Sequence, residues 1–285
     1  MLDLSAVRRI YAEMACAYAG ATDPRLVDAF AAVPREHYLG PGPWKFVTDT
    51  ERYAETPSDD PIYLYEDRLC AIDAARRLNN GLPGFLARLI GALALKPGER
   101  VAHVGAGVGY YTAIMAEMVG ASGRVFGREV DADLARRAAA NLAHYRHVEV
   151  TGGSGVDPGH RDLDALFINA GATHPLPAWL DALAPGGRLV LPLTAENRWG
   201  IVVKITRRGT GFDAACIGNV GIYPCDGARD PAAEKALGRA LKKGDQEKIA
   251  ALRRDTRAAT AAGSTGGAGA SPRLRVKVER TATER

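Results

Sequence analysis

The chain has 285 residues, of which 47% are hydrophobic and 25% charged, and its formal net charge is +4. This composition is typical of a globular protein with a sizeable core, and it excludes a disordered or collagen-like chain. No run of about 18 apolar residues occurs, and the N-terminus carries Asp3 instead of a long apolar stretch, so the sequence predicts neither a membrane span nor a signal peptide.

The four cysteines, Cys16, Cys70, Cys216 and Cys225, are scattered along the chain without a C-x-x-C pair. Such spacing is typical of reduced thiols and not of a disulfide framework or a zinc site. We therefore expect a cytoplasmic protein that holds no metal. Much of the basic excess lies in the C-terminal tail, so the net charge does not predict nucleic-acid binding by the core.

The N-terminal part, residues 1–95, is predicted to combine helices with an irregular loop segment. Residues 1–39 place apolar side chains at helical spacing as far as Pro34. Residues 40–68 are rich in glycine, proline, aspartate and tyrosine, which predicts an ordered but irregular segment. The sequence N-N-G-L-P at 79–83 predicts a turn followed by a helix over 83–95, because proline suits the first helical position.

Residues 96–228 alternate between strand-like and helical patterns, which predicts a Rossmann-like α/β fold with a seven-stranded, mainly parallel sheet. Helices are expected at 110–119, 131–143 and 177–184. Strands are expected at 100–104, 124–128, 147–151, 164–169, 188–193, 200–206 and 213–221. Only R-R-G-T-G separates the last two strands, which predicts a hairpin and an antiparallel final strand.

The C-terminal part, residues 229–285, changes in composition. Residues 231–259 are rich in alanine, lysine, glutamate and arginine, which predicts a helix. Residues 260–272 have the low-complexity composition of a linker, and the basic tail that follows is expected to be mobile.

The chain is organised around the stretch Val101–Ala113, V-A-H-V-G-A-G-V-G-Y-Y-T-A. It predicts a strand, a tight turn with Gly105, Gly107 and Gly109, and a helix that begins at Tyr110. A second strand ends at Glu129, 20 residues beyond Gly109, where a carboxylate can accept hydrogen bonds from both hydroxyls of a ribose. The spacing G-x-G-x-G differs from the dinucleotide pattern G-x-G-x-x-G, so we predict that this turn binds S-adenosyl-L-methionine.

One histidine and two tyrosines lie beside the glycine turn in the sequence, and each could bind the cofactor or pack in the core. His103 is included among the cofactor-binding candidates, although its position in the strand favours a core or supporting histidine. Tyr110 and Tyr111 begin the helix, and one is expected to face the cofactor while the other packs into the core. We assign Tyr110 to the cofactor.

Several further segments carry a resemblance to a known family. They are V-P-R-E-H-Y-L at 33–39, Y-E-D-R at 65–68, the stretch 95–113 around the glycine turn, G-R-V-F-G-R-E at 123–129 and L-A-P-G-G-R-L-V-L-P-L at 183–193. Over about residues 24–225 the chain resembles the protein-L-isoaspartate O-methyltransferase family. The resemblance implies a class I methyltransferase fold and methyl transfer from S-adenosyl-L-methionine to a carboxylate of damaged aspartyl residues.

The chain also departs from the family pattern, so it resembles a divergent member of the family. The family has an acidic residue where His103 stands, a serine in the motif Q-T-I-S-x-P where residues 78–83 have none, and G-D-G where residues 152–154 read G-G-S. These changes leave the expected fold and cofactor in place. They leave open whether the acceptor is a peptide, a protein or a dedicated small-molecule carboxylate.

Asn79 and Asn80 lie in the turn that matches the family's substrate loop, and their amides can donate hydrogen bonds to a carboxylate. Turn formation alone is the alternative role, since N-N-G is strong turn chemistry. We assign both asparagines to the catalytic site, where a carboxylate acceptor is already ionised at pH 7 and requires no general base.

The end of the fourth strand carries Asn169 and His174, at the edge of the sheet where ligands bind in this fold. We assign Asn169 to the cofactor and His174 to the catalytic residues. A second hypothesis is a small-molecule O- or N-methyltransferase that uses His174 as its general base. A third is a protein that binds S-adenosyl-L-methionine without catalysis.

Overall fold

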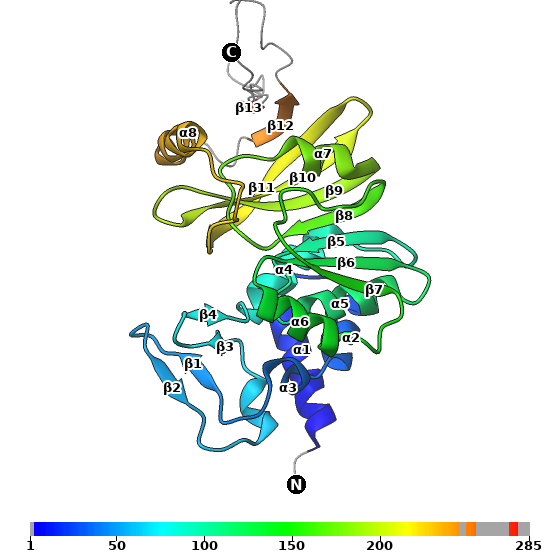
Figure 1. The fold of residues 1–285 in the computed structure, drawn as a ribbon, viewed down its shortest axis with the longest axis vertical. Helices are drawn as coiled ribbons and strands as arrows, with labels where there is room; N and C mark the ends of the chain where they lie inside the picture. Colours follow the sequence, from blue (N-terminus) through cyan, green and yellow to red (C-terminus); the bar gives the residue numbers. More distant parts are fainter. Residues whose placement is uncertain (1–2, 245–248, 255–273, 279–285) are drawn as a thin grey trace, which may run out of the picture. The chain divides into compact units, whose positions relative to one another are not determined.

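The computed structural model describes residues 3–244, 249–254 and 274–278, and the chain divides into two compact units between Gly155 and Val156 (Figure 1). This division is not among the boundaries that composition suggested at 95/96 and 228/229, and those boundaries stay predictions. In the described ranges, no helix combines the length and apolar character needed to cross a membrane.

The first unit contains the predicted N-terminal helices and the glycine turn. Its helices are α1 (Leu4–Ala19), α2 (Pro24–Ala32), α3 (Arg35–Leu39), the 3-10 helix η1 (Pro61–Leu64), α4 (Pro83–Leu93), α5 (Tyr110–Val119) and α6 (Ala132–Asn141). Its strands are β1 (Lys45–Val47), β2 (Tyr53–Glu55), β3 (Ala71–Asp73), β4 (Leu78–Asn79), β5 (Arg100–Val104), β6 (Arg124–Glu129) and β7 (Val148–Gly152).

The helical prediction for residues 1–39 is confirmed. Asp3 and Asp23 cap α1 and α2, because each side chain accepts a hydrogen bond from a main-chain N–H in the first turn. The segment 40–68 is irregular as predicted, except for the short antiparallel pair β1–β2 and the turn of η1.

Arg35 fixes this irregular segment from inside the unit. Its side chain is fully buried, and Nη1 donates to the carbonyl oxygen of Leu64 and, at 3.0 Å, to that of Glu66. Asp67, in the same loop, accepts a hydrogen bond of 2.7 Å from the N–H of Gly84 in the first turn of α4. The motifs V-P-R-E and Y-E-D-R therefore act together to hold the loop against the start of α4.

The three strands β5, β6 and β7 form a parallel sheet in the order of the chain, and α5 follows β5. Every residue of α5 except Glu117 is buried. A helix that is apolar all round lies inside a core, so the glycine turn is attached to a well-buried support on both sides.

The second unit contains the rest of the predicted strands and two helices. Its strands are β8 (Leu163–Ile168), β9 (Leu183–Thr194), β10 (Trp199–Arg208), β11 (Gly211–Gly221), β12 (Ile249–Arg254) and β13 (Leu274–Val278). Its helices are α7 (Pro177–Ala182) and α8 (Pro231–Lys242). All seven strands expected from the sequence are present, three of them in the first unit and four, β8–β11, in the second.

The predicted reversal at the end of the sheet is confirmed. β8 and β9 are parallel, and β11 pairs antiparallel with β10 through the hairpin that closes at Arg208 and Gly211. The structure adds a second reversal, because β10 is also antiparallel to β9.

The predicted helix over 231–259 is wrong for residues 249–254. The helix α8 ends at Lys242, and Gly244 follows with φ of 72°, a left-handed conformation that stops a helix. Residues 249–254 then form β12, which pairs with β11. The alanine-rich sequence favours a helix locally, but the available strand edge of β11 outweighs that preference.

The tail is described only in part. Leu274–Val278 form β13, antiparallel to β12, where we expected no regular structure. The predicted linker at 260–272 lies outside the described residues.

Candidate functional site

The glycine turn adopts a backbone that the sequence predicts. Gly105, Gly107 and Gly109 have φ of 81°, 56° and 93°, a region that side chains with a Cβ rarely occupy. The N–H groups of Gly105 and Ala106 both donate to the carbonyl oxygen of Arg128, at 2.8 and 3.1 Å. The turn is therefore fixed to the end of β6 by its main chain.

Glu129 contacts this turn directly. Its carboxylate is buried, with 7% of the residue exposed, and Oε2 accepts a hydrogen bond of 2.7 Å from the N–H of Gly107. Oε1 accepts one of 3.0 Å from the N–H of Asp131. Each carboxylate oxygen can accept more than one hydrogen bond, so capacity remains for ligand hydroxyls. The structure thus brings together the two features that the sequence predicted to form one site.

His103 is a core residue of the same support. It is fully buried, and its Nδ1 lies 2.9 Å from the hydroxyl oxygen of Thr112 in α5. Burial lowers the pKa of His103 to about 3, so the imidazole is neutral at pH 7. These surroundings agree with a supporting role, and binding of the cofactor by His103 stays a prediction.

The two tyrosines at the start of α5 pack against each other and against Phe30, but their hydroxyls contact different groups. Tyr110 is fully buried in an aromatic cluster, with its hydroxyl 3.3 Å from that of Tyr11 and its ring 5.6 Å from that of Tyr38. The hydroxyl of Tyr111 donates to the carbonyl oxygen of Gly81 at 3.3 Å. The side chain of Tyr110 is therefore committed to packing, and its assignment to the cofactor stays a prediction.

The turn before α4 contains both predicted asparagines. Asn79 accepts a hydrogen bond of 2.8 Å from the hydroxyl of Tyr53 and donates one of 3.1 Å to the carbonyl oxygen of Arg77. Asn80 is 6% exposed, and its main-chain N–H donates to the carbonyl oxygen of Cys70 at 2.8 Å. Within the part of the chain that the structure describes, its amide Nδ2 is buried without a hydrogen-bond partner.

Gly81 stands where the family motif Q-T-I-S-x-P has its serine. Its φ is 72°, and a Cβ there would lie 2.9 Å from Cδ2 of Leu86. A serine at this position would be strained by the backbone and crowded by its neighbour. The backbone of this turn therefore favours glycine over serine at position 81.

In the second unit, the loop after β8 carries Asn169 and His174. Nδ1 of His174 lies 3.0 Å from the hydroxyl oxygen of Thr173, and burial lowers the pKa of His174, an effect that the nearby Asp230 opposes. The roles of Asn169 and His174 stay predictions.

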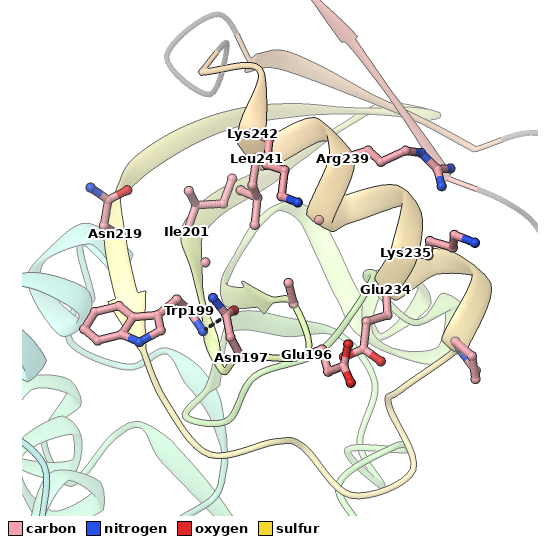
Figure 2. A pocket seen from close by; sticks show the side chains of 14 residues that line it. Glu196, Asn197, Trp199, Ile201, Asn219, Glu234, Lys235, Arg239, Leu241 and Lys242 are labelled. Carbon is pink, nitrogen blue, oxygen red and sulfur yellow. Dashed lines mark hydrogen bonds between the residues drawn. The ribbon is translucent and has the colours of Figure 1, made fainter.

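A groove in the second unit contains none of the predicted residues. It has a volume of about 1220 Å³ and is lined by the turn between β9 and β10, by β10 and β11, and by α8. Figure 2 shows Trp199, which is 64% exposed, and Glu234 among its lining residues. The sequence offered no motif that pointed to this groove.

Comparison with known proteins identifies the family. The family model described as Protein-L-isoaspartate(D-aspartate) O-methyltransferase matches residues 15–220. The chain belongs to this family.

Its relatives within the protein-L-isoaspartate O-methyltransferases include archaeal and bacterial proteins. The chain is 32% identical to the enzyme of Pyrobaculum neutrophilum over 202 residues, which cover 69% of this chain and 87% of the relative. It is 34% identical to that of Methylorubrum populi over 209 residues, which cover 72% of this chain and 88% of the relative. It is 34% identical to that of Aeropyrum pernix over 177 residues, and there it spans 61% of the relative.

Solved structures of the family share the fold. A protein-L-isoaspartate O-methyltransferase superposes with a TM-score of 0.65 at 22% identity, covering 82% of this chain and 69% of the other. A second, from Plasmodium falciparum and described as putative, superposes with a TM-score of 0.61 at 18% identity, covering 77% of this chain and 98% of the other. Both comparisons support the class I methyltransferase fold.

Some residues of this family member were missed by sequence reasoning. Arg35 and Asp67 lie in the motifs V-P-R-E and Y-E-D-R, but the sequence did not indicate that their side chains hold the irregular segment in place. Tyr111 was expected to pack in the core if Tyr110 faces the cofactor, but its hydrogen bond to the turn at Gly81 was not anticipated. Arg229 follows the family match and carries no motif, so only the structure could reveal its contacts.

Proposed function

We propose that this chain is an S-adenosyl-L-methionine-dependent protein-L-isoaspartate O-methyltransferase. The observation that carries the proposal is the contact between Glu129 and the N–H of Gly107, at the glycine turn of a chain that belongs to this family. A carboxylate held at the mouth of such a turn suits the two hydroxyls of a ribose. The three positive φ angles are occupied by glycines, so no side chain in the turn blocks the close approach of a ligand.

The reaction makes modest demands on the protein. An oxygen of the isoaspartyl carboxylate attacks the methyl carbon of the sulfonium, the new C–O bond forms as the C–S bond breaks, and S-adenosylhomocysteine leaves. The carboxylate is ionised at pH 7, so the protein has to align the reactants and exclude water and does not have to remove a proton.

Asn80 is the residue of this chain that best suits the acceptor. Its Nδ2 is a buried donor without a partner in the described structure, and leaving such a group unsatisfied costs about 1–3 kcal/mol. A carboxylate oxygen that accepts from this amide would remove that cost. Asn79 has both amide groups engaged, so we assign it to the shape of the turn.

The two other hypotheses are not favoured. Membership of a carboxyl methyltransferase family argues against a reaction that needs His174 as a base, and Nδ1 of that histidine already contacts Thr173. The third hypothesis keeps the same cofactor site, so the glycine turn and Glu129 do not separate it from an enzyme; membership of an enzyme family is what favours catalysis.

The test uses S-adenosyl-L-methionine with a radiolabelled methyl group and a pair of peptides that differ only in one residue, isoaspartate or aspartate. We expect base-labile label, as a methyl ester, in the isoaspartyl peptide alone. Equal labelling of both peptides would contradict isoaspartyl specificity. No labelling of either, by a chain that binds the cofactor, would contradict the proposed function.

A further inference from the structure

The loop after β8 is held by a segment beyond the part of the chain that the family model matches. That match ends at residue 220. The N–H of Gly171 donates to the main-chain carbonyl oxygen of Tyr223 at 2.7 Å, and the carbonyl oxygen of Gly171 accepts from the N–H of Cys225 at 2.8 Å. The N–H of Thr173 donates to Ala228 at 3.1 Å. Residues 223–228 thus run beside the loop and are joined to it by main-chain hydrogen bonds.

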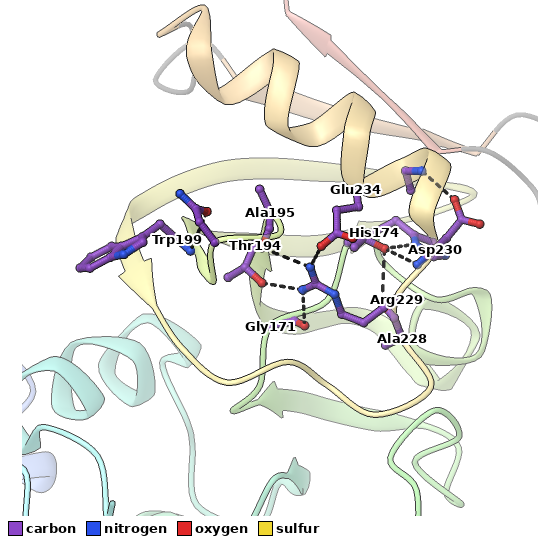
Figure 3. Close-up of polar contacts among 12 residues, drawn as sticks. Gly171, His174, Thr194, Ala195, Trp199, Ala228, Arg229, Asp230 and Glu234 are labelled. Carbon is purple, nitrogen blue, oxygen red and sulfur yellow. Dashed lines mark hydrogen bonds and ion pairs between the residues drawn. The ribbon is translucent and has the colours of Figure 1, made fainter. Parts of the chain in front are cut away.

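Arg229 joins this layer to three elements at once (Figure 3). Its Nη1 donates to the carbonyl oxygen of Gly171 at 3.1 Å and to the hydroxyl of Thr194 at 2.8 Å. Its Nη2 donates to the carbonyl oxygen of Ala195 at 3.2 Å and forms an ion pair with Glu234. The loop after β8, the end of β9 and the first turns of α8 therefore meet at one guanidinium.

The chemistry of this contact requires arginine. Four acceptors surround the two terminal nitrogens, and the side chain is only 21% exposed. The planar guanidinium presents several donors in fixed directions, whereas a lysine ammonium has three donors on a flexible stem and cannot reach the same set. Replacement by lysine would keep the charge and lose part of the geometry.

The same segment also orients His174. The N–H of Asp230 donates to the hydroxyl oxygen of Thr173 at 3.0 Å, and that oxygen lies 3.0 Å from Nδ1 of His174. The carboxylate of Asp230 accepts from the N–H of Ala233 at the start of α8. The imidazole is therefore connected through Thr173 to the residue that follows Arg229.

We propose that Arg229 is a positioning residue for the methyl acceptor, which acts by holding the loop from Gly171 to His174 in one conformation. The proposal rests on the proposed function, because this loop follows the carboxyl end of a parallel strand, where ligands bind in open α/β folds. Arg229 itself is not expected to touch the acceptor. Its loss should loosen the loop while the cofactor turn, which is part of the first unit, keeps its affinity.

The kinetic test compares Arg229→Lys with Arg208→Lys, using an isoaspartyl peptide. Arg208 is a matched control, since it pairs with Asp213 in the same unit but both side chains are more than 60% exposed, at 65% and 62%. In Arg229→Lys we expect kcat/KM for the peptide to fall roughly 10- to 100-fold, mainly through a higher KM, because small displacements of positioning groups are costly. The Kd of S-adenosyl-L-methionine should stay within about twofold, and Arg208→Lys should resemble wild type.

Hydrogen exchange supplies a readout that does not depend on activity. The amides of Gly171 and Thr173 should exchange faster in Arg229→Lys than in Arg208→Lys, while amides of the first unit stay unchanged. A lower kcat with unchanged KM and unchanged exchange would mean a smaller folded fraction and would overturn the proposal. If the wild-type chain methylates no isoaspartyl peptide, the proposed function fails, and the exchange data still decide whether Arg229 holds the loop.

Discussion

The two units place their key polar residues at different depths. In the first unit, Arg35 and His103 are fully buried and Glu129 is 7% exposed. In the second unit, Arg229 and its partner Glu234 keep 21% and 25% of their side chains exposed. Buried polar groups depend on their partners more than exposed ones do, because water cannot replace a lost hydrogen bond. The comparison implies that substitutions of Arg35, His103 or Glu129 act on folding as well as on any binding, whereas those of Arg229 or Glu234 act mainly on local order.

The largest effect is expected for Arg35→Met. The substitution leaves the carbonyl oxygens of Leu64 and Glu66 without their buried donor and removes the cation–π contacts with Tyr11 and Tyr110. We expect the free energy of unfolding to fall by about 3–5 kcal/mol, measured by urea denaturation. Arg136→Met is the control, since that side chain is 74% exposed, and it should change stability by about 0.5 kcal/mol or less. Similar losses in both variants would show that burial does not set the contribution of an arginine to stability in this unit.

Lowering the pH should reduce the free energy of unfolding more through the buried His103 than through the half-buried His174. The pKa of His103 is lowered to about 3, below the unfolded value near 6.5, so its stabilising contribution is complete above pH 6.5 and is lost as the pH falls. Between pH 6.5 and 5 this loss is about 2 kcal/mol. The half-buried His174 has a pKa lowered in the same direction, but its partial exposure makes the effect smaller. His103→Leu should therefore flatten the dependence of the unfolding free energy on pH more than His174→Ala does, and equal slopes would argue against the burial of His103.

The smallest effect is expected for Glu234→Gln in the second unit. The substitution removes the charge that faces Arg229 but keeps a hydrogen-bond acceptor, and both side chains are partly solvated. We expect a loss of about 1 kcal/mol or less, seen as a small fall in the thermal midpoint. A loss as large as that of Arg35→Met would show that depth of burial does not separate the units.

The amino-acid sequence was sufficient to predict those parts of the structure that depend on neighbouring residues alone. The three glycines, the helix from Tyr110 and the distance to Glu129 follow from backbone rules that act over a few residues. Contacts between distant segments could not be predicted in this way. The hydrogen bond from Arg229 to Gly171 joins residues 58 positions apart, and that from Arg35 to Leu64 joins residues 29 apart. The strand at 249–254 was missed for a related reason, since its partner edge on β11 decides its conformation and its own alanines do not.

We propose that Glu129 and the glycine turn bind S-adenosyl-L-methionine, and calorimetric titration of the cofactor into wild type and Glu129→Ala measures this contribution. Loss of a buried carboxylate that accepts from two hydroxyls should weaken binding by about 1–3 kcal/mol, which is roughly a 5- to 150-fold higher Kd. Glu117→Ala, at the one exposed position of α5, is the control and should bind as wild type does. A higher Kd in Glu129→Ala alone, with the fold intact by circular dichroism, is the predicted result, and an unchanged Kd in that variant would contradict the assignment of Glu129 to the cofactor site.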